Sequence, residues 1–161
     1  MTELYFLRHA HAGDPMAWDG PDEARPLSNK GERQADRLGR FLVSVRFTPD
    51  IFITSPKLRA SQTADIVATH LGTRVEIDDR LASSFSVDML EDVLRDAGDA
   101  DRAVVVGHDP DFSALVAGLC GAPDIPMRKG ALARIDIGRP LRPGTGTLRW
   151  LVPPDLLQYG R

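Results

Sequence analysis

The fold is decided by residues 3–11, ELYFLRHAH, in which a run of apolar side chains leads directly into a cation and two imidazoles. The apolar part, residues 3–7, has the length of a short buried strand. Arg8, His9 and His11 follow it, and a buried strand has no structural use for such a polar cluster. We therefore expect a β-strand whose carboxyl end opens into a cleft that handles an anion.

The composition is that of an ordinary globular protein. A chain of 161 residues is expected to form a single domain, residues 1–161, and 42% hydrophobic with 27% charged residues is typical of such domains. The net charge of −3 argues against a nucleic-acid binder, which needs a basic excess. The single Cys120 excludes an internal disulfide and a zinc site built from cysteines.

From the sequence we expect neither a signal peptide nor a membrane-spanning run. The N-terminus enters a strand without a basic segment, and no apolar run approaches the roughly 18 residues that a spanning helix needs. We expect a cytoplasmic monomer that does not contact membranes.

Strands and helices alternate along most of the chain. Short apolar runs predict strands at residues 3–7, 51–53, 75–77 and 102–106. Helical spacing of apolar side chains predicts helices at 29–45 and 58–71, between Ser86 and Gly98, and after Asp109-Pro110, with Asp109 as its N-cap. Residues 12–27 form a long polar loop, for which function is the usual explanation.

The last third of the chain changes character. Residues 133–137 and 148–152 alternate apolar and other side chains around a Gly- and Pro-rich loop, which predicts an antiparallel pair at a sheet edge. Continuous apolar strands separated by helices indicate an α/β protein. The fold that we expect is a three-layer α/β/α sandwich with a mostly parallel central sheet.

Three strand ends carry the residues with reactive chemistry. Arg8 and His9 follow the first strand, Arg59 follows the second at the start of a helix, and His108 follows the strand at 102–106. In open α/β sheets the ligand crevice lies at the carboxyl ends of the strands. We therefore expect these four side chains to converge, whereas His11 has no firm role and could reach the same cleft as a substrate contact.

These residue types suit a phosphoryl group. Two guanidinium groups can each form a bidentate fork onto phosphate oxygens, and Arg59 also lies in the first turn of a helix, which favours an anion. Cations lower the pKa of a neighbouring imidazole, so His9 can be a neutral nucleophile towards phosphorus. A protonated His108 could then stabilise charge on the phosphate oxygens.

Four motifs in order resemble those of the histidine phosphatase superfamily, which has the phosphoglycerate mutase-like fold. Residues 7–10 (LRHA) resemble its Arg-His-Gly signature, and 25–31 (RPLSNKG) its step into the first helix. Residues 54–64 (TSPKLRASQTA) resemble the segment with its second arginine, and 105–110 (VVGHDP) the strand end with its second histidine. The short length is similar to the SixA-type phosphohistidine phosphatases, the small bacterial branch.

The resemblance implies a metal-independent phosphatase without a cofactor. His9 would become transiently phosphorylated and then be hydrolysed by water, and Arg8, Arg59 and His108 would complete the phosphate pocket. The substrate would be a phosphohistidine-bearing protein or a small phosphorylated molecule.

The sequence departs from the family pattern at two places. Ala10 replaces the signature glycine, and residues 80–86 (RLASSFS) contain no carboxylate where larger members carry a glutamate proton donor. Asp79 and Asp88 flank this segment without aligning with that acid. An alkoxide leaving group needs such a donor, worth roughly 10²–10⁴-fold in rate, whereas a phosphorylated imidazole departs easily. The departure favours phosphohistidine over sugar or glycerate phosphates.

Other classes remain open. His9-x-His11 resembles the metal-binding pair of amidohydrolase barrels, and His108-Asp109 that of HD-type hydrolases, but such a barrel needs about 200–250 residues and HD proteins are helical. A non-catalytic module that binds a phosphorylated group, and a phosphatase of small phosphate esters, are the alternatives that the motifs do not separate from a phosphohistidine phosphatase.

Overall fold

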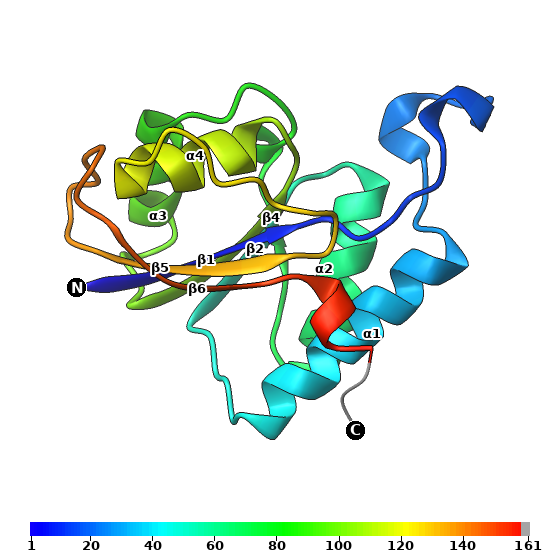
Figure 1. The fold of residues 1–161 in the computed structure, drawn as a ribbon, viewed down its shortest axis with the longest axis horizontal. Helices are drawn as coiled ribbons and strands as arrows, with labels where there is room; N and C mark the ends of the chain where they lie inside the picture. Colours follow the sequence, from blue (N-terminus) through cyan, green and yellow to red (C-terminus); the bar gives the residue numbers. More distant parts are fainter. Residues whose placement is uncertain (159–161) are drawn as a thin grey trace.

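The structure is a computed structural model that describes residues 1–158. Within them, six strands form one sheet in the order β3-β2-β4-β1-β5-β6 (Figure 1). The strands are β1 (Thr2–Arg8), β2 (Ile51–Thr54), β3 (Glu76–Ile77), β4 (Arg102–Gly107), β5 (Leu132–Ile137) and β6 (Thr147–Val152). The helices are α1 (Asn29–Ser44), α2 (Leu58–Leu71), α3 (Val87–Asp96) and α4 (Asp111–Cys120).

The sheet is parallel except at one edge. Strands β1, β4, β2 and β3 pair in parallel, whereas β5 pairs antiparallel with both β1 and β6. The edge pair and the mostly parallel sheet predicted from the sequence are thus confirmed.

Two hydrophobic cores lie on opposite faces of the sheet. Helices α1 and α2 cover one face, where Leu38 and Val67 pack against Tyr5 and Val104 of the central strands. Helices α3 and α4 cover the other, where Leu90 and others pack against β1, β4 and β5. Figure 1 shows the two helix pairs on either side of the sheet, so the three-layer α/β/α sandwich is confirmed.

Among the helices, the predicted boundaries differ from the structure most clearly at the start of α4. Helix α2 occupies the predicted residues 58–71, and Gly72 ends it in the left-handed conformation, with φ of 65°. The N-cap of α1 is Ser28, which accepts a hydrogen bond from Gly31 N. The prediction of Asp109 as N-cap of α4 is wrong. The N-cap position is Pro110, one residue later, although the Asp109 carboxylate accepts hydrogen bonds from the backbone and hydroxyl groups of Ser113 in the first turn of α4.

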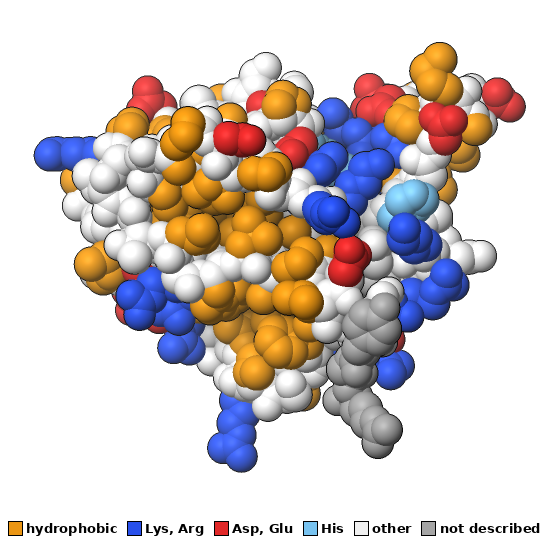
Figure 2. Space-filling view, viewed as in Figure 1, with side chains coloured by type: hydrophobic (Ala, Val, Ile, Leu, Met, Phe, Trp, Pro, Cys, Tyr) orange, Lys and Arg blue, Asp and Glu red, His pale blue; other side chains and the backbone are white. Residues whose placement is uncertain are grey.

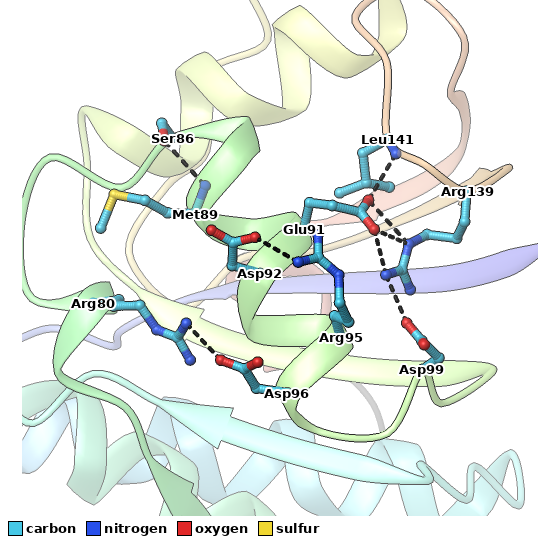
Figure 3. Close-up of polar contacts among 10 residues, drawn as sticks. All are labelled: Arg80, Ser86, Met89, Glu91, Asp92, Arg95, Asp96, Asp99, Arg139 and Leu141. Atoms are coloured by element: carbon cyan, nitrogen blue, oxygen red, sulfur yellow. Dashed lines mark hydrogen bonds and ion pairs between the residues drawn. The ribbon is translucent and has the colours of Figure 1, made fainter.

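An ion-pair network attaches the β5–β6 connection to α3, away from the strand ends that carry the reactive residues (Figure 3). Arg139 Nη2 donates to Glu91 Oε1 at 2.6 Å and to Asp99 Oδ1 at 2.8 Å. Glu91 also accepts a hydrogen bond from Leu141 N at 2.7 Å. The Arg139–Glu91 pair is half-buried, so it fixes the loop more firmly than an exposed pair would.

The loop at residues 12–27 contains two short 3-10 turns, η1 (Pro15–Ala17) and η2 (Asp22–Ala24). It projects from the body of the protein on the side where β1 ends (Figure 1). No helix within residues 1–158 has the length and apolar character required to span a bilayer.

Candidate active site

The strand order brings the two reactive histidines to the same edge of the sheet. In the parallel pair β1–β4, Arg8 lies opposite Gly107, so His9 and His108 are the next residues of adjacent strands. The centroids of their imidazole rings are 5.2 Å apart. The pairing of the two strands continues to this point, since His9 N donates a hydrogen bond to Gly107 O at 3.0 Å.

The second arginine arrives from the neighbouring strand. Strand β2 pairs with β4, with Thr54 opposite Val106, and the chain then turns into α2, whose second residue is Arg59. The Arg59 side chain is buried and lowers the pKa of both site histidines. The structure therefore places Arg8, His9, Arg59 and His108 in one site, at the strand ends where the sequence analysis expects them.

His9 has an unprotonated Nε2, whose lone pair is free to react. Its Nδ1 lies 2.7 Å from Ala10 O, and a carbonyl only accepts hydrogen bonds, so Nδ1 carries the proton and Nε2 does not. Burial, followed by the charges of Arg59 and Arg8, lowers the pKa of His9 to about 3. The expected neutral imidazole is present, although burial rather than the surrounding cations is the main cause.

His108 is also neutral in this structure. Burial lowers its pKa to about 3, and His9, Arg59 and Lys57 contribute in the same direction. Burial thus favours a neutral His108, in contrast to the protonated form expected from the sequence. His108 Nε2 lies 2.7 Å from Ser55 Oγ, and Ser55 Oγ accepts a hydrogen bond from Lys57 N. If the Ser55 hydroxyl donates to Nε2, the proton of His108 lies on Nδ1.

Asp22 holds the guanidinium group of Arg59 from the protruding loop. Arg59 Nη1 donates to Asp22 O at 2.9 Å, and Arg59 Nη2 donates to Asp22 Oδ2 at 3.0 Å. The Arg59 and Arg25 side chains hold the pKa of Asp22 below its ordinary value, although burial acts in the opposite direction. Arg25 Nη1 in turn donates to Ala12 O, which fixes the loop against the end of β1.

Three buried polar atoms of the site have no hydrogen-bond partner within residues 1–158. They are Arg8 Nε, Arg59 Nε and His108 Nδ1. The two guanidinium nitrogens are obligatory donors, and the tautomer inferred above makes His108 Nδ1 a third donor. Unpaired buried donors are costly, so their concentration in one site indicates a ligand with several acceptor oxygens.

The loop between α4 and β5 forms another wall of the site. Arg8 Nη1 donates to Met127 O at 2.8 Å and lies 3.4 Å from the Asp109 carboxylate. Gly130 N donates to the carbonyl oxygens of both Arg8 and His9. Lys129 is therefore held beside the nucleophile candidate, and its charge also lowers the pKa of His9.

His11 lies at the rim, beside the N-terminus of α1. Its Nδ1 is 2.6 Å from Ser28 Oγ, and its backbone nitrogen donates to Gln34 Oε1. Burial, Lys30 and Lys129 lower the pKa of His11. His11 thus lies at the edge of the site, in contact with the N-cap of α1, and its role as a substrate contact stays a prediction.

Residues of the sequence motifs that lie outside the pocket connect the segments that form it. Ala10 N donates to Thr63 Oγ1 at 3.0 Å, and Leu27 N donates to Gln62 Oε1 at 2.8 Å, so α2 anchors both ends of the protruding loop. Gly31 approaches the backbone of His11 so closely that a Cβ would clash with it. The glycine of this motif is therefore required by packing.

Sequence reasoning missed Asp22, Ser55 and Lys129. Ser55 lies inside the motif at 54–64, so its position beside His108 could have been suspected. Asp22 and Lys129 come from irregular loops, where no periodicity indicates direction. Within residues 1–158, no group of three His, Cys, Asp or Glu side chains is arranged to hold a metal ion.

Comparison with known proteins assigns the family. The model of the histidine phosphatase superfamily (branch 1) matches residues 4–85, which is half of the chain. The chain belongs to the histidine phosphatase superfamily. An uncharacterized protein of Picosynechococcus is 36% identical over 113 residues, which cover 68% of each chain.

Two further comparisons extend over nearly the whole chain. The phosphohistidine phosphatase SixA of Escherichia coli is 26% identical over 99% of this chain and 98% of its own length. The solved structure of the protein histidine phosphatase SixA with tungstate has a TM-score of 0.83, with 25% identity, and covers 97% of this chain and 99% of that one. The chain therefore has the fold of SixA, the phosphoglycerate mutase-like fold predicted from the motifs.

Proposed function

We propose that this histidine phosphatase superfamily member hydrolyses phosphohistidine in proteins, through a phosphohistidine intermediate on its own His9. The observation that carries the proposal is the neutral His9, with an unprotonated Nε2, beside three buried nitrogens without partners on Arg8, Arg59 and His108. The activity would reside in a single domain, residues 1–161, and would need neither metal nor cofactor.

The reaction proceeds in two displacements. In the first, the His9 Nε2 lone pair forms a bond to phosphorus while the bond from phosphorus to the substrate nitrogen breaks, and the departing imidazole keeps the electron pair and takes a proton. In the second, water attacks phosphorus and the bond from phosphorus to His9 Nε2 breaks. Inorganic phosphate is released, and His9 returns to its neutral form. In both steps the charge on the three phosphoryl oxygens that do not react is stabilised by Arg8, Arg59 and the Nδ1 hydrogen of His108.

The choice of phosphohistidine follows from the leaving group. The segment at 80–86 contains no carboxylate, and Arg80 is engaged with Asp78 and Asp96. Asp22, whose carboxylate lies 3.0 Å from Arg59, has a lowered pKa and so is a poor proton donor. An imidazole departs without the acid that an alkoxide requires. The resemblance to SixA supports the same substrate class, and the tungstate bound by that relative supports a pocket for a tetrahedral oxyanion.

A panel of substrates tests the proposal. We expect steady release of phosphate from a phosphohistidine protein, much slower release from phosphoserine and from p-nitrophenyl phosphate, and no effect of EDTA. Preferential hydrolysis of small phosphate esters would replace the proposed substrate class. His9→Ala is expected to abolish turnover, and retention of more than a few per cent of the activity would exclude His9 as the nucleophile.

His70 provides a matched control for the loss of a histidine. It lies outside the site, with Nε2 2.8 Å from Asp36 Oδ1 between α1 and α2. His70→Gln is therefore expected to keep the phosphohistidine phosphatase activity, which separates the chemistry of His9 from general damage to the fold.

A phospho-group binding module is the second candidate, and the absence of the family acid is the observation that favours it. In that case no substrate of the panel would turn over, and vanadate or a phosphorylated protein would bind with micromolar affinity. Turnover of any phosphorylated substrate that His9→Ala abolishes excludes this candidate.

A further inference from the structure

The use of lysine in this chain is unusual. Only three of its 20 basic residues are lysines, Lys30, Lys57 and Lys129, and each of them is close enough to a site histidine to lower its pKa. Within residues 1–158 none of the three ammonium groups forms an ion pair, whereas most of the arginines do. The lysines therefore form an uncompensated cationic rim on a protein whose net charge is −3.

Two of these lysines lie on the same side of the pocket. Lys30 and Lys129 both lower the pKa of His11, whereas Lys57 acts on His108 at the other side. The contacts of the neighbouring residues support this placement, since Ser28, two residues before Lys30, has its Oγ 2.6 Å from His11 Nδ1, and Gly130, which follows Lys129, donates to His9 O at 2.9 Å. Figure 2 shows Lys and Arg side chains gathered beside a histidine, next to the protruding segment.

The backbone holds Lys129 in place. Gly130 N donates to Arg8 O at 3.0 Å and to His9 O at 2.9 Å, and Ala131 N donates to Arg128 O. Lys129 is half-buried, and the charges of Arg8, Arg25 and Arg59 act on it. A lysine placed among three arginines is repelled by all of them, which has no structural benefit unless an anion joins the group.

We propose that Lys129, with Lys30 and His11, forms a second anion subsite beside the phosphate pocket, which binds a carboxylate or phosphate elsewhere on the same substrate. The inference rests on the proposed function, which places the phosphoryl group of the substrate in the pocket. It adds that the substrate carries a second negative group close to that phosphoryl group. Asp14 is the acidic side chain with the clearest effect on Lys129, and its carboxylate already accepts a hydrogen bond from Met16 N. The substrate class is therefore a phosphoryl group flanked by negative charge, such as an acidic phosphopeptide or a carboxylated phosphate ester.

A pair of non-hydrolysable ligands tests the subsite without requiring turnover. Propylphosphonate and 3-phosphonopropionate have the same length and differ only in a terminal methyl or carboxylate. We expect calorimetry to show about fivefold tighter binding of 3-phosphonopropionate, and loss of that preference in 0.5 M NaCl, because solvent-accessible ion pairs contribute modestly to affinity and are screened by salt.

Lys129→Gln is expected to bring the affinity ratio close to one, and Lys30→Gln to reduce it. Arg74→Gln is the charge-matched control, because Arg74 is an exposed cation in the segment that follows α2, and it should keep the full preference. Equal binding of the two phosphonates by the wild type, or an unchanged preference in both lysine variants, would overturn the proposal. If Lys129→Gln does not fold, the Lys30→Gln result decides.

Turnover measurements then identify the source of the second anion and test the proposed function separately. Two blocked phosphohistidine peptides with Glu or Gln on both sides represent a protein substrate, and phosphoglycolate with ethyl phosphate represents a small ester. A preference for the Glu peptide alone indicates an acidic protein segment, and one for phosphoglycolate alone indicates a metabolite. If the phosphonate preference holds but none of the four compounds is hydrolysed, the subsite stands and the proposed function fails.

Discussion

Acidification should destabilise the protein through its two neutral site histidines. Burial lowers the pKa of both His9 and His108 from 6.5 to about 3, so below pH 6.5 the unfolded chain takes up two protons that the folded protein excludes. The free energy of unfolding therefore falls as the pH drops from 6.5 towards 3. For each histidine this amounts to about 2 kcal/mol between pH 7 and pH 5, or about 4 kcal/mol for the pair.

Urea denaturation at pH 7 and pH 5, in buffer without phosphate, measures this loss. The control is His9→Gln/His108→Gln, in which the two groups no longer titrate while the carboxylates titrate as before. The loss in the wild type should exceed that in the double variant by about 4 kcal/mol, and each single variant should show about half of the excess. Equal losses in the wild type and the double variant would refute the neutral, buried state of the two histidines.

The remaining predictions concern one cation of the pocket, its support and a distant ion pair. Arg59→Ala should weaken vanadate binding by about 10- to 100-fold, since hydrogen bonds between charged groups contribute about 1.5–3 kcal/mol; unchanged affinity would contradict its place in the pocket. Asp22→Ala should lower kcat/KM about tenfold because Arg59 loses its orientation, whereas Asp22→Asn keeps an acceptor oxygen and should stay within about threefold of the wild type; equal rates for both variants would exclude a positioning role. Glu91→Gln should reduce the free energy of unfolding by about 2–3 kcal/mol, measured by urea denaturation, because it leaves the half-buried Arg139 charge partly uncompensated, and should leave kcat/KM unchanged; an unaltered stability would show that the network contributes little.

The fold could be predicted because its signals are local. The apolar runs before Arg8 and before Gly107 are continuous, whereas a strand with one exposed face alternates apolar and polar residues. These runs therefore indicate strands that are buried on both faces of the sheet. Leu58–Leu71 carried both a helical pattern and a terminal glycine, and its boundaries were predicted correctly. The start of α4 was not, because the helix begins one residue later, after Pro110, although the Asp109 carboxylate accepts a hydrogen bond from Ser113 N in its first turn.

Only those site residues that lie at or just after the ends of strands could be predicted from the sequence. Parallel pairing of β1 with β4 is sufficient to place His9 beside His108, and any sheet with these strands as neighbours would do so. The partners of these residues depend on irregular loops, so nothing in the sequence pattern connected Asp22 with Arg59. The charge state of His108 depends on its depth in the structure, which the sequence does not contain.

Direct detection of the intermediate tests the central claim. The protein is mixed with excess phosphohistidine substrate, quenched in base within the first turnover, digested and mapped by mass spectrometry. We expect a phosphate on the peptide that contains His9, stable in base and labile in acid, and none on the same peptide of His9→Ala. A phosphate on any other residue, or steady turnover by the wild type with no phosphorylated peptide in that first turnover, would contradict it.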